Sequence, residues 1–70
     1  MELHKDWINP HVDLEDVDGN AFVIIATLAQ GLRRAGNSDE VIETYREAAV
    51  RGGDYDNLLR VSMLYAGMLD

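Results

Sequence analysis

The residues best suited to chemistry lie near the N-terminus, where Asp16-Val17-Asp18-Gly19 is similar to the start of a calcium-binding loop. Such a loop has an acid at its first position, a glycine at its sixth and a bidentate acid at its twelfth. Placing Gly19 sixth puts Leu14 first and Ile25 twelfth, and neither side chain can bind calcium. We therefore expect an acidic turn that precedes a helix, and no calcium site.

The two histidines, His4 and His11, could bind a metal together with Asp13. They stand in a segment without helical periodicity, and no further ligand motif follows them. The chain has no cysteine, which excludes disulfides and thiolate metal sites. We expect both histidines to be exposed to solvent, and no metal or other cofactor to be bound.

Signatures of nucleophilic or phosphate chemistry are also missing. The segment Gly31-Leu32-Arg33-Arg34-Ala35-Gly36 lacks the Gly-Lys-Ser/Thr end of a phosphate loop and lies within a predicted helix. No serine or threonine has a base partner that the sequence reveals. A chain of 70 residues offers little room for a pocket that excludes water. We expect the protein not to be an enzyme.

The net charge of −7 is unevenly distributed. Residues 1–18 hold only one cation, Lys5, against six acids: Glu2, Asp6, Asp13, Glu15, Asp16 and Asp18. Direct nucleic-acid binding needs cations, so this balance argues against it. It favours a basic protein surface as partner, with plain solubility as the alternative explanation. No apolar run reaches the roughly 20 residues that span a bilayer, so we expect a cytoplasmic protein without membrane contact.

The patterning predicts an all-α fold, a small three-helix bundle with an extended acidic N-terminal arm. We expect the arm over residues 1–17 and the helical domain over 18–70, with helices at about 20–35, 39–51 and 54–69. Their start signals are Asp18 or Asn20, then Asn37 or Ser38, then Asp54. A bundle this small and without disulfides is marginal alone, which raises the expectation of a homo-oligomer.

The first predicted helix has an apolar arc wide enough to touch two neighbours. At 100° per residue, the arc contains Ala21, Phe22, Ile24, Ile25, Leu28, Ala29, Leu32 and Ala35. Gly31 falls in the middle of this helix, at a cost near 1 kcal/mol relative to alanine. A neighbouring segment that approaches the backbone closely would explain that glycine.

The last predicted helix carries two apolar stripes. The core stripe contains Leu58, Leu59, Ser62, Tyr65, Ala66 and Leu69, and the second contains Val61, Leu64 and Met68. A bundle of three short helices cannot easily bury both. Either the second stripe contacts another molecule or the N-terminal arm covers it, with Trp7 and Ile8 as the natural cover. Those two residues could instead anchor a partner, because tryptophan is enriched at binding hot spots.

Asp18-Gly19-Asn20-Ala21-Phe22 and Gly53-Asp54-Tyr55-Asp56-Asn57-Leu58-Leu59, with Leu32-Arg33-Arg34-Ala35-Gly36 between them, resemble a family of short phage and prophage proteins. The resemblance covers roughly residues 12–65 and leaves out the arm with Trp7. Small acidic phage proteins without a catalytic motif often bind a host protein and inhibit bacterial immunity. The resemblance therefore implies a host protein as partner, in an anti-defence or anti-CRISPR role.

The residues and the resemblance together predict a small acidic, non-enzymatic protein that binds and inhibits a host protein. The expected partner-binding residues are Trp7, Ile8, Asp13, Glu15, Asp16, Val61, Leu64 and Met68. One alternative is an oligomeric sponge for a nucleotide signal, bound by arginines. Another is a DNA mimic that presents the acids of the second helix, Asp39, Glu40, Glu43 and Glu47, together with those of the arm.

Overall fold

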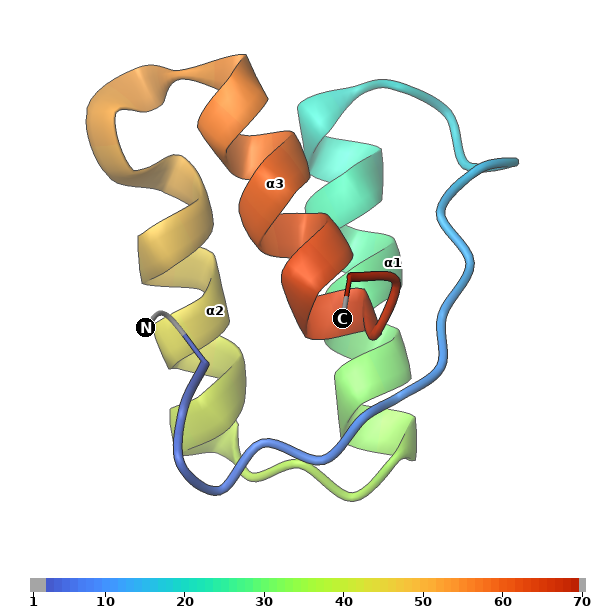
Figure 1. Cartoon of the computed structure of the whole chain (residues 1–70), viewed down its shortest axis with the longest axis vertical. Coiled ribbons are helices and arrows are strands. Elements are labelled where there is room, and N and C mark those ends of the chain that lie inside the picture. The colour runs from blue at the N-terminus through green and yellow to red at the C-terminus, as the bar shows by residue number, and fades with distance from the viewer. Residues whose placement is uncertain (1–2, 70) are drawn as a thin grey trace.

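The computed structural model of the chain describes residues 3–69, so Glu2 of the predicted acidic arm lies outside the described residues. Three α-helices pack side by side, and the N-terminal segment runs around them (Figure 1). The elements are α1 (Ala21–Arg34), α2 (Asp39–Val50), the short 3-10 turn η1 (Arg51–Gly53) and α3 (Tyr55–Ala66). No residue from 3 to 69 belongs to a β-strand, and the predicted all-α three-helix bundle is confirmed.

Each helix begins at a side chain that accepts a hydrogen bond from its first turn. Asn20 accepts from Phe22 N–H, Ser38 from Val41 N–H and Asp54 from the N–H two residues on. These bonds satisfy backbone donors that a helix start leaves without partners. The sequence offered two candidate caps for each of the first two helices. Asn20 rather than Asp18 caps α1, and Ser38 rather than Asn37 caps α2.

The third helix ends three residues earlier than predicted, at Ala66 rather than Leu69. Gly67 has a φ of 85°, and its N–H bonds to the carbonyls of Leu64 and Met63. This left-handed glycine turns the chain out of the helix. Leu69, predicted in the core stripe, is consequently exposed.

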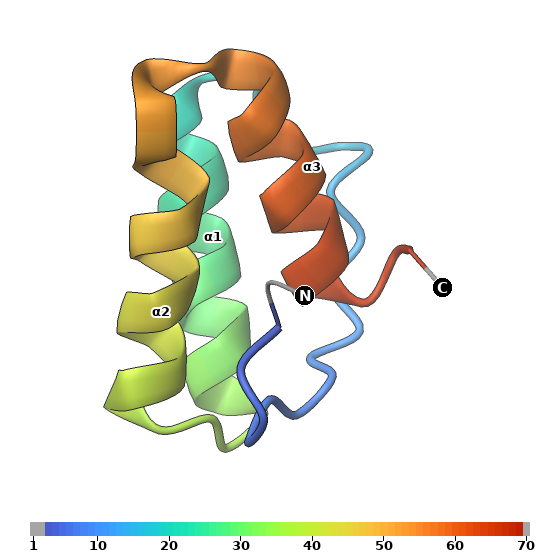
Figure 2. The same ribbon diagram turned by 60° about the vertical axis from the view of Figure 1, so that its left-hand side comes forward.

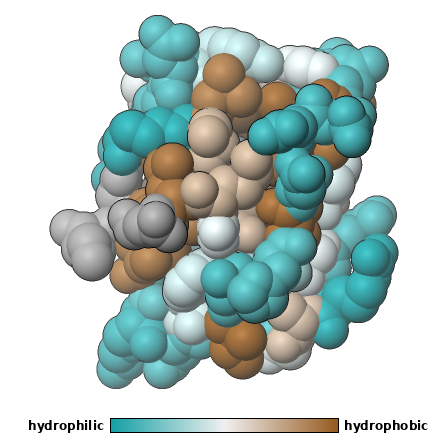
Figure 3. Space-filling model, turned by 45° about the vertical axis from the view of Figure 1, so that its right-hand side comes forward, coloured by the Kyte–Doolittle hydropathy of each residue, from teal (hydrophilic) through white to brown (hydrophobic). Residues whose placement is uncertain are grey.

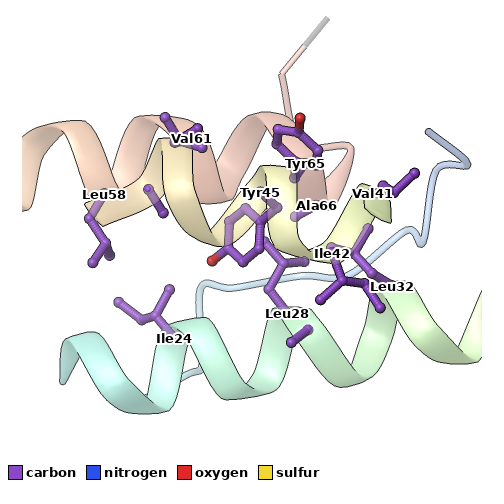
Figure 4. Packing of buried hydrophobic residues seen from close by; sticks show 13 residues of the cluster. Ile24, Leu28, Leu32, Val41, Ile42, Tyr45, Leu58, Val61, Tyr65 and Ala66 are labelled. Atoms are coloured by element: carbon purple, nitrogen blue, oxygen red, sulfur yellow. The ribbon is translucent and has the colours of Figure 1, made fainter. Parts of the chain in front are cut away.

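The core lies where the three helices meet (Figure 4). Its centre is an aromatic pair, Tyr45 of α2 and Tyr65 of α3, with ring centroids 5.3 Å apart. The hydroxyl of Tyr45 is 2.7 Å from Ser62 Oγ, and both side chains are buried. Ser62 therefore occupies a core position, as predicted, because it satisfies a tyrosine hydroxyl that water cannot reach. Burial raises the pKa of the Tyr45 hydroxyl.

The N-terminal arm is packed on the bundle along its whole described length. It crosses the end where α1 turns into α2, then runs back beside α1 and α3 to the start of α1 (Figures 1 and 2). Its apolar side chains pack against the core: Leu3, Trp7, Val12, Leu14 and Val17. A two-residue alternation of apolar and polar positions over Val12–Glu15 turns one side inward and leaves the acids outside.

Gly31 explains how the arm can lie so close to α1. A Cβ atom added there would lie 2.5 Å from Cγ2 of Val12, well inside van der Waals contact. The predicted close approach to this glycine is confirmed, and the approaching segment is the arm. Within residues 3–69, no helix has both the length and the apolar character needed to cross a membrane.

Candidate interaction surfaces

The arm docks onto carbonyl groups that the end of α3 leaves without helical partners. The indole N–H of Trp7 donates to the Tyr65 carbonyl at 3.0 Å, and Val12 N–H donates to the Ala66 carbonyl at 3.1 Å. The last carbonyls of any helix need donor partners from outside it. The arm supplies them here, so its position is fixed by directional bonds as well as by apolar contact.

Asn37, in the turn between α1 and α2, fixes the first part of the arm. Its side-chain oxygen accepts from Ile8 N–H at 2.7 Å, and its amide donates to the carbonyls of Ile8 and Leu32, both at 2.9 Å. The residue is buried, so these bonds satisfy an amide shielded from water. This role replaces the predicted alternative of Asn37 as a helix cap.

His4 is held between the arm and α2. Its Nδ1 accepts from Asp6 N–H at 3.0 Å, so Nε2 carries the proton and donates to Glu40 Oε2 at 2.9 Å. Only 11% of its side chain is exposed. The prediction of a solvent-exposed His4 is wrong, because the arm folds back onto the bundle at this residue. His11 is exposed, as predicted.

The predicted second stripe of α3 is not an open surface. Val61 is fully buried in the core, so it cannot contact a partner, and its assignment as a partner-binding residue is wrong. Met68 is half-buried, and its sulfur accepts from Leu14 N–H at 3.4 Å. Leu64 is also half-buried. The arm covers part of this side of α3, which is the alternative that the sequence left open.

The proposed cover residues, Trp7 and Ile8, behave differently from each other. Trp7 packs against the core and is bonded to α3, so it is a structural anchor of the arm. Ile8 is 47% exposed, although its backbone is bonded to Asn37. Only Ile8 of this pair presents a large part of its side chain to solvent.

An apolar hollow of about 180 Å³ remains where the arm, α3 and the start of α1 meet, and we call it the arm groove. Its lining residues are Leu14, Glu15, Val17, Gly19, Ile24, Tyr55, Leu59, Met63 and Met68. The face formed by the arm and α3 has an apolar area in its middle with hydrophilic residues around it (Figure 3). Two methionines give the groove flexible, polarisable side chains that can adapt to different apolar partners.

Acidic residues of the arm, and Asp18 directly after it, stand beside this groove. Asp13, Glu15, Asp16 and Asp18 are all exposed. The carboxylates of Asp13 and Asp18 each accept from a backbone N–H two residues further on, at 2.9 Å. These turns hold both carboxylates at the surface in defined positions. The arm groove is therefore an apolar site in a negative field.

A second apolar hollow of about 410 Å³ lies between α1 and α2, and we call it the helical groove. It is lined by Phe22, Ile25, Ala26, Arg46, Glu47 and Val50. Phe22 is 85% exposed and Val50 is 55% exposed. The placement of Phe22 in the core arc is thus wrong. The arc of α1 is wider than the surfaces that α2, α3 and the arm cover, and Phe22 lies at its uncovered edge.

Sequence reasoning missed the helical groove because Phe22 and Val50 lie on different predicted helices. A signal was present, since Val50 falls outside the apolar stripe of the second helix, which contains Val41, Ile42, Tyr45, Ala48 and Ala49. An apolar residue at the uncovered edge of each of two adjacent helices is the pattern that identifies such a surface.

The other polar groups are distributed over the surface. Among residues 3–69, no three histidine or acidic side chains are gathered in a way that could hold a metal ion. Arg33 bonds to Asp39 at 2.9 Å, and Arg60 bonds to Asn57 at 2.9 Å, so these two arginines lie in separate networks. Comparison of the chain with protein-family models, curated proteins and solved structures found no match. The arm groove and the helical groove are therefore the two candidate interaction surfaces.

Proposed function

We propose that the protein is a small non-enzymatic interaction protein that binds and inhibits a host protein through the arm groove. The observation that carries this proposal is the apolar groove bordered by the exposed acids of the arm. An apolar hollow provides affinity through burial, and the surrounding charge selects the partner and speeds its association.

The charge defines the chemistry of the partner. Asp13, Glu15 and Asp16 stand on the arm beside the groove, and the whole chain has a net charge of −7. A matching segment has a medium-sized apolar side chain that enters between Met63 and Met68, flanked by lysine or arginine. The resemblance to short phage proteins supports a bacterial host protein as the source of that segment. Binding would then take place in the host cytoplasm, and its consequence would be an anti-defence role.

The two alternative functions receive less support from the contacts of individual residues. A DNA mimic would present the acids of α2, yet Asp39 bonds to Arg33 and Glu40 bonds to His4 within the chain. A nucleotide sponge would gather arginines around phosphate. Arg34, however, lies beside the arm at Pro10 and Val12, whereas Arg46 lies in the helical groove.

The groove can be tested with a synthetic amphipathic peptide of leucine and lysine, compared with the same peptide carrying glutamate in place of lysine. We expect the basic peptide to shift the methyl NMR signals of Met63 and Met68, and the acidic peptide to leave them unchanged. Joint substitution Asp13→Asn, Glu15→Gln and Asp16→Asn should weaken binding at least about tenfold. The effect should shrink as salt rises from about 50 mM to about 500 mM.

The matched control is Phe22→Asp, which changes the helical groove and should leave peptide affinity unchanged. In host lysate, the wild-type chain and the Phe22→Asp variant should bind the same host protein and inhibit its activity. The Met63→Gln variant should no longer bind that host protein. Equal binding of both peptides would overturn the proposal. So would retention of the host protein by the variant that lacks all three arm acids.

A further inference from the structure

We infer that the helical groove is a self-association surface, where a second copy of this chain docks by two-fold symmetry. This inference does not depend on the proposed function, because the groove lies between α1 and α2 and the arm groove lies where the arm meets α3. The arm crosses the end where α1 turns into α2 and then runs back beside α1 (Figures 1 and 2), and no arm residue is among those that line the helical groove.

The apolar content of this surface calls for a covering partner. Phe22, 85% exposed, stands beside Ile25, Ala26 and Val50 with no other segment of residues 3–69 over it. Exposed aromatic side chains grouped with other apolar residues are uncommon on proteins that remain alone in water. In a two-fold contact, Phe22 of each copy would lie against the groove of the other.

The local charge identifies a second copy as the occupant. Each chain carries a net charge of −7, so two copies repel one another wherever their acids face each other. The charged residues that line the helical groove are one cation, Arg46, and one anion, Glu47. Arg46, which also has Glu43 at 3.9 Å, gives each copy a cation that can face an acid of the other copy, whereas the charged lining residue of the arm groove is the acid Glu15.

Arg46 and Glu47 are arranged for reciprocal pairing. A two-fold interface brings residue i of one copy to residue j of the other, and j to i. Arg46 can thus pair with Glu47 of the second copy, and Glu47 with its Arg46. Among residues 3–69, the one ion pair of Arg46 is a long contact to Glu43, at 3.9 Å, and its side chain is 48% exposed. The guanidinium can reorient toward a second copy at little cost.

The size of the surface sets the expected strength. Helices of 14 and 12 residues present a face roughly 20 Å long, at 1.5 Å per residue. Interfaces that bury less than about 1,200 Å² in total are usually weak and reversible. We therefore expect a dimer with a dissociation constant in the micromolar range.

Sedimentation equilibrium of the full chain tests this inference. Between about 1 µM and about 1 mM, the wild-type mass should rise from that of a monomer to that of a dimer. Phe22→Asp should remain monomeric over the same range, and at about 1 µM, where both proteins are monomers, its thermal unfolding midpoint should equal that of the wild type because the side chain is exposed. Ile8→Asp is the matched control, an equal change at a half-exposed apolar residue of the arm, and it should dimerise like the wild type.

Charge reversal tests the two-fold arrangement. Arg46→Glu alone and Glu47→Arg alone should each weaken the dimer at least about tenfold, because each brings like charges together twice. The double exchange Arg46→Glu with Glu47→Arg should restore the wild-type dimer. A wild-type chain that stays monomeric at about 1 mM would overturn the inference, as would a Phe22→Asp variant that dimerises normally. The inference would also be overturned if the wild-type chain is monomeric and binds a different protein that the Phe22→Asp variant no longer binds.

Discussion

The arm groove and the helical groove are both apolar hollows, but they differ in how they are built and in the charge around them. The arm groove is assembled from residues far apart in the sequence, such as Leu14 and Met68, and is bordered by acids. The helical groove is formed by two consecutive helices and contains one cation and one anion. In a docking site of either kind, apolar area would supply affinity, whereas the charge at the rim would decide which partner can approach.

The difference extends to the role of aromatic residues. Trp7 and Phe22 are both large apolar side chains outside the fully buried core. Trp7 packs inward and bonds to α3, whereas Phe22 projects from α1 into solvent. The first residue stabilises the fold and the second is available for binding. Three predictions test this division, in order of decreasing effect.

The largest effect is expected for Trp7→Ala, which should lower the free energy of unfolding by about 3 kcal/mol. The substitution removes the apolar contact with the core and leaves the Tyr65 carbonyl without its indole donor. Trp7→Phe keeps most of the contact and should cost about 1 kcal/mol. Urea denaturation measures both values.

Phe22→Ala is the comparison variant. Measured at a concentration where the chain is monomeric, it should change the free energy of unfolding by less than about 0.5 kcal/mol. Equal losses for Trp7→Ala and Phe22→Ala would show that the arm and the helical groove do not differ in the way described above.

The second prediction concerns the contact between Gly31 and Val12. In an isolated helix, Gly31→Ala would stabilise by about 1 kcal/mol. Here the added methyl would overlap Val12 Cγ2, so we expect a net loss of about 2 kcal/mol and weaker binding of the basic peptide, because the arm is displaced. Val12 is β-branched and cannot easily move aside.

A double-mutant cycle separates this overlap from other effects. Val12→Ala removes the colliding methyl groups, so adding Gly31→Ala to that variant should stabilise it or leave it unchanged. Strict additivity of the two losses would contradict the close approach. Dimerisation through the helical groove should stay the same in all four proteins of the cycle.

The smallest effect is expected for Tyr45, in the core of the bundle. Tyr45→Phe should cost about 1 kcal/mol at neutral pH, because the buried Ser62 hydroxyl loses its partner. Burial raises the pKa of Tyr45 above its ordinary value of 10.0, an effect that the Ser62 hydrogen bond and the charge of Arg46 only partly offset. The folded state therefore retains this proton at pH values where the unfolded chain releases it.

The sign of the pH dependence follows from that difference. The contribution of Tyr45 to stability is complete below pH 10.0 and declines as the pH rises above it. The decline reaches at most about 1.4 kcal/mol per pH unit for one proton. Tyr45→Phe should make the loss of stability in this alkaline range less steep, as urea denaturation at several pH values would reveal. Identical slopes for the two proteins would contradict the effect of burial.

Helix positions and the core were largely predictable from the sequence because they depend on local signals. The cap at Asp54, the turn after α1 at Gly36 and the apolar spacing of α2 are properties of neighbouring residues. Even Gly31 indicated a close neighbour, although it could not identify that neighbour. The end of α3 was misplaced because the apolar pattern continues to Leu69, whereas Gly67 already ends the helix.

The grooves could not be derived in the same way. Periodicity assigns both Phe22 and Val61 to apolar stripes, yet Phe22 is exposed and Val61 is fully buried. Which stripe is covered depends on the route of the arm, and that route is fixed by bonds between distant residues, such as Val12 with Ala66 and Ile8 with Asn37. Local pattern contains no information about such pairs.

The sequence by itself determined the helical class, the helix starts and the acidic character of the arm, because capping and spacing act over a few residues. The tertiary structure alone decided that the arm closes the second side of α3 and that the α1–α2 side stays open. The physical reason is that a helix end offers free carbonyls wherever it lies, and only the folded chain brings Trp7 and Val12 to the end of α3 to bond them.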